Sequence, residues 1–278
     1  MPTSQAILIQ ERPKPARVRI GHSHVDMVTY EEALDRLVDL AEAPSGRGYV
    51  VTPNAQHLVL LESDLYLRKI FSEAAMVVPD GISLVYASKL LGEPLKERVT
   101  GVDLFQGLCG RAAESGLRVF LLGGRRGAAE QAAAKLKLVY PGLIVAGTCC
   151  PPFGFHRDEM GLGDVARAVL DARPHILFVA LGAPKQEYWI YEHGRNLGVP
   201  LSIGIGGSFE MVGGMTRRAP LWVQQAGLEW LFRVALEPRR LWKRYLIGNA
   251  QFLSIVLRQA VSRREVSRGG QDKAEGRT

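Results

Sequence analysis

Two charged residues stand at positions where they could do chemistry. Asp80 ends the apolar run AMVVPDG, and Arg98 follows in the polar stretch ERVTG. A carboxylate at the mouth of a buried strand can take a proton from a substrate hydroxyl, and a guanidinium suits phosphate oxygens. Both residues also have simpler explanations. Pro-Asp-Gly is an ordinary turn, and Arg98 could form a weak surface ion pair with Glu93 or Glu97.

Polar residues or glycines follow the other apolar runs as well. Open parallel sheets bind ligands at the carboxyl ends of their strands. Glycines there let the backbone approach a ligand, and helix N-termini present N–H groups to phosphate. We therefore predict a nucleotide-type ligand, although the sequence has neither a G-x-G-x-x-G fingerprint after its first strand nor a Walker motif. The positions are Thr52, Asn54, Gly123, Gly124, Gly182 and Gly206.

The elements that must position these residues alternate between short apolar runs and helical patterns from residue 30 to residue 210. Strands that are apolar throughout and alternate with helices predict a parallel sheet covered on both faces. We expect an α/β fold with a Rossmann-like, doubly wound, mostly parallel sheet. The predicted strands are GYVVTPN, AMVVPDG, LRVFLLGG, LIVAGTC, HILFVALG and PLSIGIGG.

The composition is that of an ordinary soluble globular protein. Of 278 residues, 47% are apolar and 23% charged, and the net charge is +7. The start of the sequence does not resemble a secretory signal, and no run reaches the roughly 20 apolar residues of a spanning helix. Cys109, Cys149 and Cys150 have neither metal-ligand nor disulfide spacing, which favours a reducing compartment. We expect a cytoplasmic protein.

The last quarter of the chain is basic and rich in tryptophan. Its arginines predict an anionic partner, which could be a phosphate, a nucleic acid or a lipid surface, unless they only form a solvated helix face. Trp222 and Trp230 are spaced to share one helical face. Pro238 should divide the segment into two amphipathic helices, and the chain from residue 264 is polar enough to be disordered.

Several long motifs, in order, resemble the WecG/TagA/CpsF glycosyltransferases (glycosyltransferase family 26) from about residue 18 to 253. They are VTPNAQH, VVPDGISLV, ERVTGVDL, FLLGG, LGAPKQEYWI and RRAPLWVQQAGLEWLFRVALEPRRLWKRY. The resemblance implies inverting transfer from a UDP-sugar to a sugar on a polyprenyl diphosphate, for exopolysaccharide or cell-wall polymer synthesis. The donor sugar stays open between a glucose type and N-acetylmannosamine or its uronic acid.

The resemblance also implies roles for residues in the first part of the site. Asp80 matches the general base, and Arg98 would stabilise the diphosphate charge or orient the sugar. Thr52, Asn54 and Gln186 match contacts to the donor sugar, while Thr52 and Asn54 would also make good helix caps.

Further roles concern the nucleotide and the C-terminal segment. Lys185 would add positive charge for UDP. Glu210 stands where the family often has an aspartate associated with the nucleotide. Arg233, Arg240 and Arg244 match arginines of the family's C-terminal appendage, which implies membrane attachment and binding of the lipid diphosphate. No D-x-D pair lies near a strand end, so we expect neither a metal nor a cofactor, and cations would assist UDP departure.

These expectations divide the chain into an arm (1–17), a catalytic domain (18–212), a membrane-associating helical appendage (213–263) and a disordered tail (264–278). We expect a protein peripheral on the inner face of the cytoplasmic membrane, as a possible homo-oligomer. One rival is a catalytically silent nucleotide-sugar-binding regulator of the same fold. The other is a nucleic-acid binder, which the long apolar segments of the appendage disfavour, so we expect no nucleic-acid partner.

Overall fold

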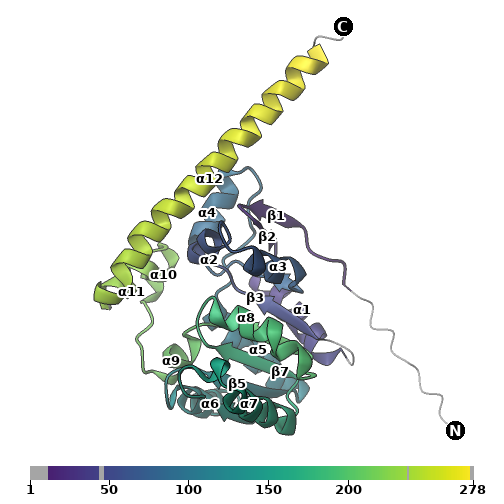
Figure 1. Cartoon of the computed structure of the whole chain (residues 1–278), viewed down its shortest axis with the longest axis vertical. Helices are drawn as coiled ribbons and strands as arrows, with labels where there is room; N and C mark the ends of the chain where they lie inside the picture. The colour runs from purple at the N-terminus through teal and green to yellow at the C-terminus, as the bar shows by residue number, and fades with distance from the viewer. Residues whose placement is uncertain (1–11, 44–46, 237, 276–278) are drawn as a thin grey trace, which may run out of the picture.

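The computed structural model describes residues 12–43, 47–236 and 238–275 of the chain, with the side chains at 156, 225, 240, 241, 244 and 264–275 left out (Figure 1). Its main sheet has six parallel strands in the order β4-β3-β8-β7-β5-β6. Each strand falls within one of the predicted apolar runs, which confirms the predicted parallel sheet. The strands are β3 (Gly48–Val51), β4 (Met76–Val77), β5 (Arg118–Gly123), β6 (Ile144–Cys149), β7 (Ile176–Ala180) and β8 (Leu201–Gly204).

Helices cover both faces of the sheet, which confirms the doubly wound arrangement. Successive strand residues point to opposite faces, and two apolar cores result. Leu121 packs in one core and Leu122 in the other. The first core holds side chains of α1 (Tyr30–Glu42), α5 (Gly101–Ser115), α6 (Ala128–Val139) and α9 (Ser208–Gly213). The second holds side chains of α2 (Ala55–Leu60), α3 (Leu65–Glu73), α4 (Ile82–Leu90), α7 (Glu159–Ala172) and α8 (Lys185–Glu192). Two short 3₁₀ helices, Phe155–Arg157 and Gly194–Asn196, complete this part.

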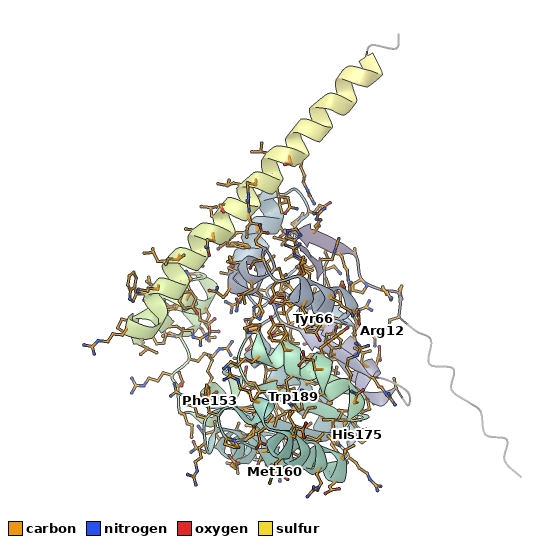
Figure 2. The ribbon with its side chains drawn as sticks, viewed as in Figure 1. Arg12, Tyr66, Phe153, Met160, His175 and Trp189 are labelled. Atoms are coloured by element: carbon orange, nitrogen blue, oxygen red, sulfur yellow. The ribbon has the colours of Figure 1, made fainter. Side chains whose placement is uncertain are left out.

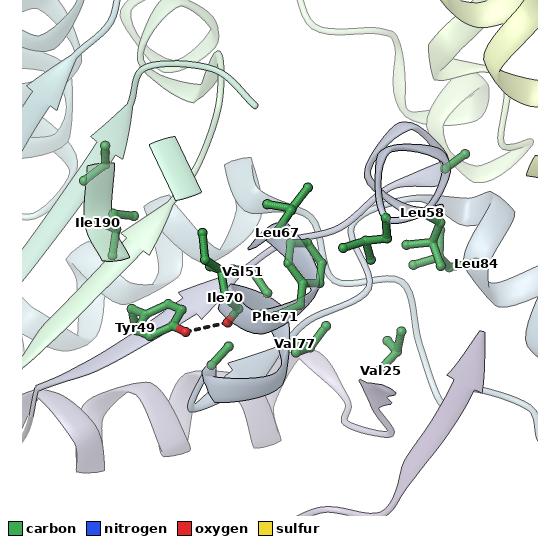
Figure 3. Packing of buried hydrophobic residues seen from close by; sticks show 14 of the residues in the cluster. Val25, Tyr49, Val51, Leu58, Leu67, Ile70, Phe71, Val77, Leu84 and Ile190 are labelled. Atoms are coloured by element: carbon green, nitrogen blue, oxygen red, sulfur yellow. Dashed lines mark hydrogen bonds between the residues drawn. The ribbon is translucent and has the colours of Figure 1, made fainter. Parts of the chain in front are cut away.

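The second core packs β3 and β4, the strand that precedes Asp80, against the helices on that face of the sheet. Val51 and Val77 pack near Leu67 of α3, and the Tyr49 hydroxyl donates a hydrogen bond to the backbone carbonyl of Ile70 (Figure 3). Burial raises the pKa of Tyr49 above that of a free phenol. The strand ends are therefore held by packing and by a buried hydrogen bond between sheet and helix.

A β-hairpin that the sequence analysis did not predict lies before α1. It pairs β1 (Arg17–Ile20) with β2 (Ser23–Asp26). Asp26, fully buried, accepts the backbone N–H of Val77 at 2.6 Å and the Nε of Arg17 at 2.6 Å. Burial raises the pKa of Asp26, and these two donors oppose the rise. The hairpin thus fixes β4 just before the Asp80 turn.

The C-terminal segment forms three helices, α10 (Leu221–Gln225), α11 (Glu229–Leu236) and α12 (Pro238–Glu275). The prediction that Trp222 and Trp230 share one helical face is wrong, because Gly227 in the left-handed conformation (φ 73°) separates α10 from α11. Pro238 does divide two helices, as predicted. α12 extends beyond residue 264, where we expected disorder to begin; the domain boundaries themselves stay predictions.

α12 packs along the domain and extends away from it (Figure 1). Phe252, Ile255 and Val256 are buried. Gln259 binds the hairpin at two points, accepting from the Gly21 N–H at 2.7 Å and donating to the Arg19 carbonyl at 2.7 Å. No helix among the described residues is both long enough and apolar enough to span a bilayer.

Candidate active site

A cleft of about 960 Å³ opens at the carboxyl ends of the strands and is walled on one side by the C-terminal helices. The structure brings most of the predicted site residues together here. Gly123 and Lys185 line a smaller adjoining cavity of about 370 Å³ that shares Gly124 with the cleft. The side chains of Arg240 and Arg244 lie outside the described residues. The predicted residues that line the cleft are Thr52, Asn54, Asp80, Arg98, Gly124, Gly182, Gln186, Gly206, Glu210 and Arg233.

Asp80 is half-buried and held from both sides. Its backbone N–H donates to the Pro53 carbonyl at 3.0 Å, and its Oδ1 accepts the Gly101 N–H, at the start of α5, at 2.9 Å. Loss of water around the carboxyl group raises the pKa of Asp80, and the nearby Glu229 adds to the rise. The Gly101 N–H and the positive charge of Arg98 oppose it. The result is a fixed carboxylate that takes up a proton more readily than an exposed one.

Arg98 lies beside Asp80 but does not pair with either acid considered from the sequence. Its Nη1 lies 3.3 Å from Oε2 of Glu229 on α11, and the two side chains are only 15% and 21% exposed. Glu97 instead accepts the Tyr30 N–H at 2.8 Å, and Glu93 pairs with Arg263 at 3.0 Å. The simpler alternative for Arg98, a surface pair with Glu93 or Glu97, is therefore wrong. Glu229 was missed, because nothing in the spacing links residues so far apart in the chain.

Thr52 and Asn54 tie the end of β3 to its neighbours. The Thr52 hydroxyl donates to the Gly204 carbonyl at 2.8 Å, which joins β3 to β8. Asn54 caps α2, accepting the Gln56 N–H on Oδ1 at 3.0 Å. Asn54 is therefore the helix cap that the sequence suggested, whereas Thr52 serves as a cross-strand link.

Glycine at the end of β5 allows its backbone to lie close to β7, a neighbouring strand in the sheet. Gly123 has φ 97°, and a Cβ there would lie 2.7 Å from the Ala180 carbonyl oxygen. The following N–H groups are already used: Gly124 donates to Ala180 at 2.8 Å and Arg125 donates to Oε1 of Glu210 at 2.8 Å. Oε2 of Glu210 is buried without a hydrogen-bond partner among the described residues, so it can accept a hydroxyl from a ligand.

A buried polar network beside the cleft contains two residues that the sequence does not mark as functional. Glu187 (1% exposed) stands in the first turn of α8, and His57 (4%), which also lines the cleft, stands in the first turn of α2. Oε1 of Glu187 accepts Nε2 of Gln186 at 2.9 Å and lies 3.4 Å from Nε2 of His57. Oε1 of Gln186 accepts the Gly206 N–H at 3.1 Å. Both residues start helices at strand ends, so their local pattern is that of ordinary first-turn residues and gives no sign of burial.

The adjoining cavity has an aromatic wall. Phe153 is 96% exposed, and Nζ of Lys185 lies 4.8 Å from its ring centroid. In Figure 2, Phe153 lies at the edge of the domain, whereas Trp189 lies inside it. Trp230, Arg233 and Tyr245 of the C-terminal helices line the larger cleft. Cations and aromatic rings therefore line both the cleft and the cavity beside it. Within the described ranges, no group of three or more His, Cys, Asp or Glu residues could hold a metal ion.

Comparison with known proteins adds independent evidence. The model of the glycosyl transferase WecG/TagA/CpsF family matches residues 18–266. Relatives named N-acetylglucosaminyldiphosphoundecaprenol N-acetyl-β-D-mannosaminyltransferase include proteins of two Bacillus species and of Staphylococcus aureus. The Bacillus spizizenii protein is 30% identical over 229 residues, covering 82% of this chain and 86% of the relative. The Bacillus subtilis protein is 34% identical over 196 residues (70% and 73%), and the Staphylococcus aureus protein is 27% identical over 252 residues (90% and 94%).

Proposed function

The chain belongs to the WecG/TagA/CpsF family of glycosyltransferases, and from that premise we propose that it transfers a sugar, with inversion, from a UDP-sugar to a polyprenyl-diphosphate-linked sugar. The observation that carries the proposal is Asp80, held by the Gly101 N–H beside Arg98 in a large cleft. The names of the relatives favour an N-acetylmannosamine donor and an N-acetylglucosamine-diphosphate lipid acceptor in cell-wall polymer synthesis. A glucose-type donor stays the alternative.

In the proposed reaction, Asp80 is the general base. Because Oδ1 is occupied by the Gly101 N–H, Oδ2 takes the proton from the acceptor hydroxyl. The hydroxyl oxygen bonds to the anomeric carbon as the bond from that carbon to UDP breaks, and UDP leaves with the electron pair. The charge that develops on the diphosphate is stabilised by Arg98 and Arg233, so we propose that no metal ion is needed.

The remaining predicted residues would bind the donor. The unpartnered Oε2 of Glu210 supports a hydrogen bond from a ribose hydroxyl. Lys185 would add charge near the nucleotide, and Thr52, Asn54 and Gln186 would contact the sugar. The glycines 123, 124, 182 and 206 would let the backbone approach the donor.

The C-terminal helices support a proposal of peripheral membrane binding. Leu221 is 73% exposed and Trp222 68%, and Trp242 and Leu246 on α12 are 46% and 67% exposed. Basic residues are interleaved with them, so apolar groups could enter the lipid interface while cations meet anionic headgroups. We propose attachment to the inner face of the cytoplasmic membrane, with Arg240 and Arg244 near the lipid diphosphate and a homo-oligomer in solution.

The decisive experiment measures UDP release by the purified protein with a panel of UDP-sugars and a detergent-solubilised polyprenyl-diphosphate-sugar acceptor. Acceptor-dependent turnover with one donor, unchanged in EDTA and lost in Asp80→Asn, is the expected result. Tight UDP binding without turnover for any donor and acceptor would favour the silent regulator instead. Sedimentation with anionic liposomes, compared with binding to single-stranded DNA at equal salt, tests the proposed membrane binding against the alternative that the protein binds nucleic acid.

A further inference from the structure

Glu187 and His57 form a buried pair that the proposed chemistry does not use. Burying a carboxylate is costly unless its hydrogen bonds are satisfied, yet Oε2 of Glu187 has no partner among the described residues. Neither an exposed helix start nor a substrate contact explains Glu187, because it is 1% exposed and is absent from the lining of the cleft. Its contacts are to side chains that belong to the cleft.

Gln186 is held in one orientation by these contacts. Its Nε2 donates one hydrogen to Glu187 at 2.9 Å, and its Oε1 accepts the Gly206 N–H at 3.1 Å. The amide lies against bare backbone, since a Cβ on Gly204 would lie 2.7 Å from Gln186 Nε2. An amide nitrogen has two hydrogens. The second one is therefore left for a ligand in the cleft that Gln186 lines.

His57 stands between Asn54 and the same carboxylate. Its Nδ1 accepts the Asn54 backbone N–H at 3.2 Å and also lies 3.2 Å from Oδ1 of Asn54. The first contact places the hydrogen of a neutral ring on Nε2, which lies 3.4 Å from Oε1 of Glu187 but makes no hydrogen bond among the described residues. Oδ1 of Asn54 accepts the Gln56 N–H, which fixes that amide as well. The buried carboxylate thus bonds to the amide of Gln186, and the His57 ring lies between that carboxylate and Asn54.

We propose that Glu187 and His57 are positioning residues for the sugar end of the cleft. They hold the amides of Gln186 and Asn54 so that N–H groups face the oxygen atoms of the donor sugar. This inference rests on the proposed function. It concerns recognition of the sugar and not of UDP, and it depends on where the Glu187 oxygen lies rather than on its charge.

The test compares three variants by KM for the UDP-sugar that turns over in the panel and by the inhibition constant of UDP alone. Glu187→Met removes the acceptor at similar volume, and Glu187→Gln keeps an acceptor oxygen in place. Glu73→Met is the control, because Glu73 forms an exposed pair with Arg195 at 3.1 Å, away from the cleft. We expect Glu187→Met to raise KM about tenfold with UDP inhibition unchanged, whereas Glu187→Gln stays within about threefold of the wild type.

Three results would overturn the inference: a wild-type KM in Glu187→Met, an equal loss of UDP and UDP-sugar binding, or a Gln variant as impaired as the Met variant. If Glu187→Met fails to fold, ¹⁵N NMR of histidine-labelled wild-type protein tests the inference instead, because it reports the tautomer of His57. The His57→Gln variant identifies which signal belongs to His57. We expect the Nε2–H tautomer for His57, and an Nδ1–H tautomer would refute the network. Absence of turnover and of UDP binding in the wild type would instead refute the proposed function.

Discussion

Removing the carboxylate of Glu229 should strengthen UDP binding. In the structure Oε2 of Glu229 pairs with Nη1 of Arg98 at 3.3 Å. Arg98 is the cation that we propose to bind the donor diphosphate. At an effective dielectric constant near 20, two unit charges at that distance attract by about 5 kcal/mol. Desolvation and ordering offset most of this, leaving about 1–2 kcal/mol net for a partly buried pair. UDP binding to Arg98 must break this ion pair and therefore loses that free energy. The Glu229→Gln variant lacks the ion pair, so it should bind UDP about 5- to 30-fold more tightly.

Isothermal titration calorimetry with UDP measures the effect directly. The matched control is Glu93→Gln, which removes the acid from another ion pair with the C-terminal helices, that of Glu93 with Arg263 at 3.0 Å. The control should bind UDP as the wild type does. Equal or weaker UDP binding by Glu229→Gln would refute competition for Arg98.

The same variant should change the pH profile. Glu229 raises the pKa of Asp80, and a general base works only above its own pKa. In Glu229→Gln the pKa of Asp80 should fall, and the acid limb of kcat/KM should move to lower pH. A limb that moves to higher pH, or does not move, would show that Asp80 is not the group that titrates.

Four further outcomes follow from the structure. Asp80→Asn should slow turnover by about 10²–10⁴-fold without lowering the thermal midpoint at neutral pH. Because the pKa of Asp80 is raised in the fold, the fold binds that proton more tightly than the unfolded chain does, and the ionised carboxylate costs stability above the usual aspartate range. Gly123→Ala places a Cβ 2.7 Å from a carbonyl oxygen and should lower the free energy of unfolding in urea by about 1–3 kcal/mol. Asp26→Leu leaves a buried β4 N–H without its acceptor and should cost about 1–3 kcal/mol in the same assay. Trp222→Ser should reduce sedimentation with anionic liposomes while UDP binding stays unchanged, because this side chain is 68% exposed.

The sheet was predictable because its strands are buried on both faces and therefore apolar throughout. The same logic placed Asp80 and Thr52 at strand ends, where the structure brings them together in one cleft. The β1–β2 hairpin was missed, because charged and polar residues interrupt its strands, RVRI and SHVD, so that neither is an apolar run. A tertiary contact carries no local signal at all, which is why the pairing of Arg98 with Glu229 could not be found.

The burial of polar residues could not be predicted from the sequence either. Glu187 has the sequence signature of an acid in the first turn of a helix, and the pattern is the same whether that turn faces solvent or the interior. Gly227 is a visible signal for the α10–α11 break, but the prediction used only the regular spacing of the tryptophans.

Both sides of α12 are apolar, although only one side is covered. Phe252, Ile255 and Val256 are buried against the domain, and Leu253 (54% exposed) lines the cleft beside them. Leu257 and Val261, 48% and 55% exposed, follow four residues apart and so form a stripe of their own along the helix. A lipid surface could therefore be engaged without exposing the inner stripe to water. Attachment would then leave the wall of the cleft in place, and the enzyme would dock as one rigid piece.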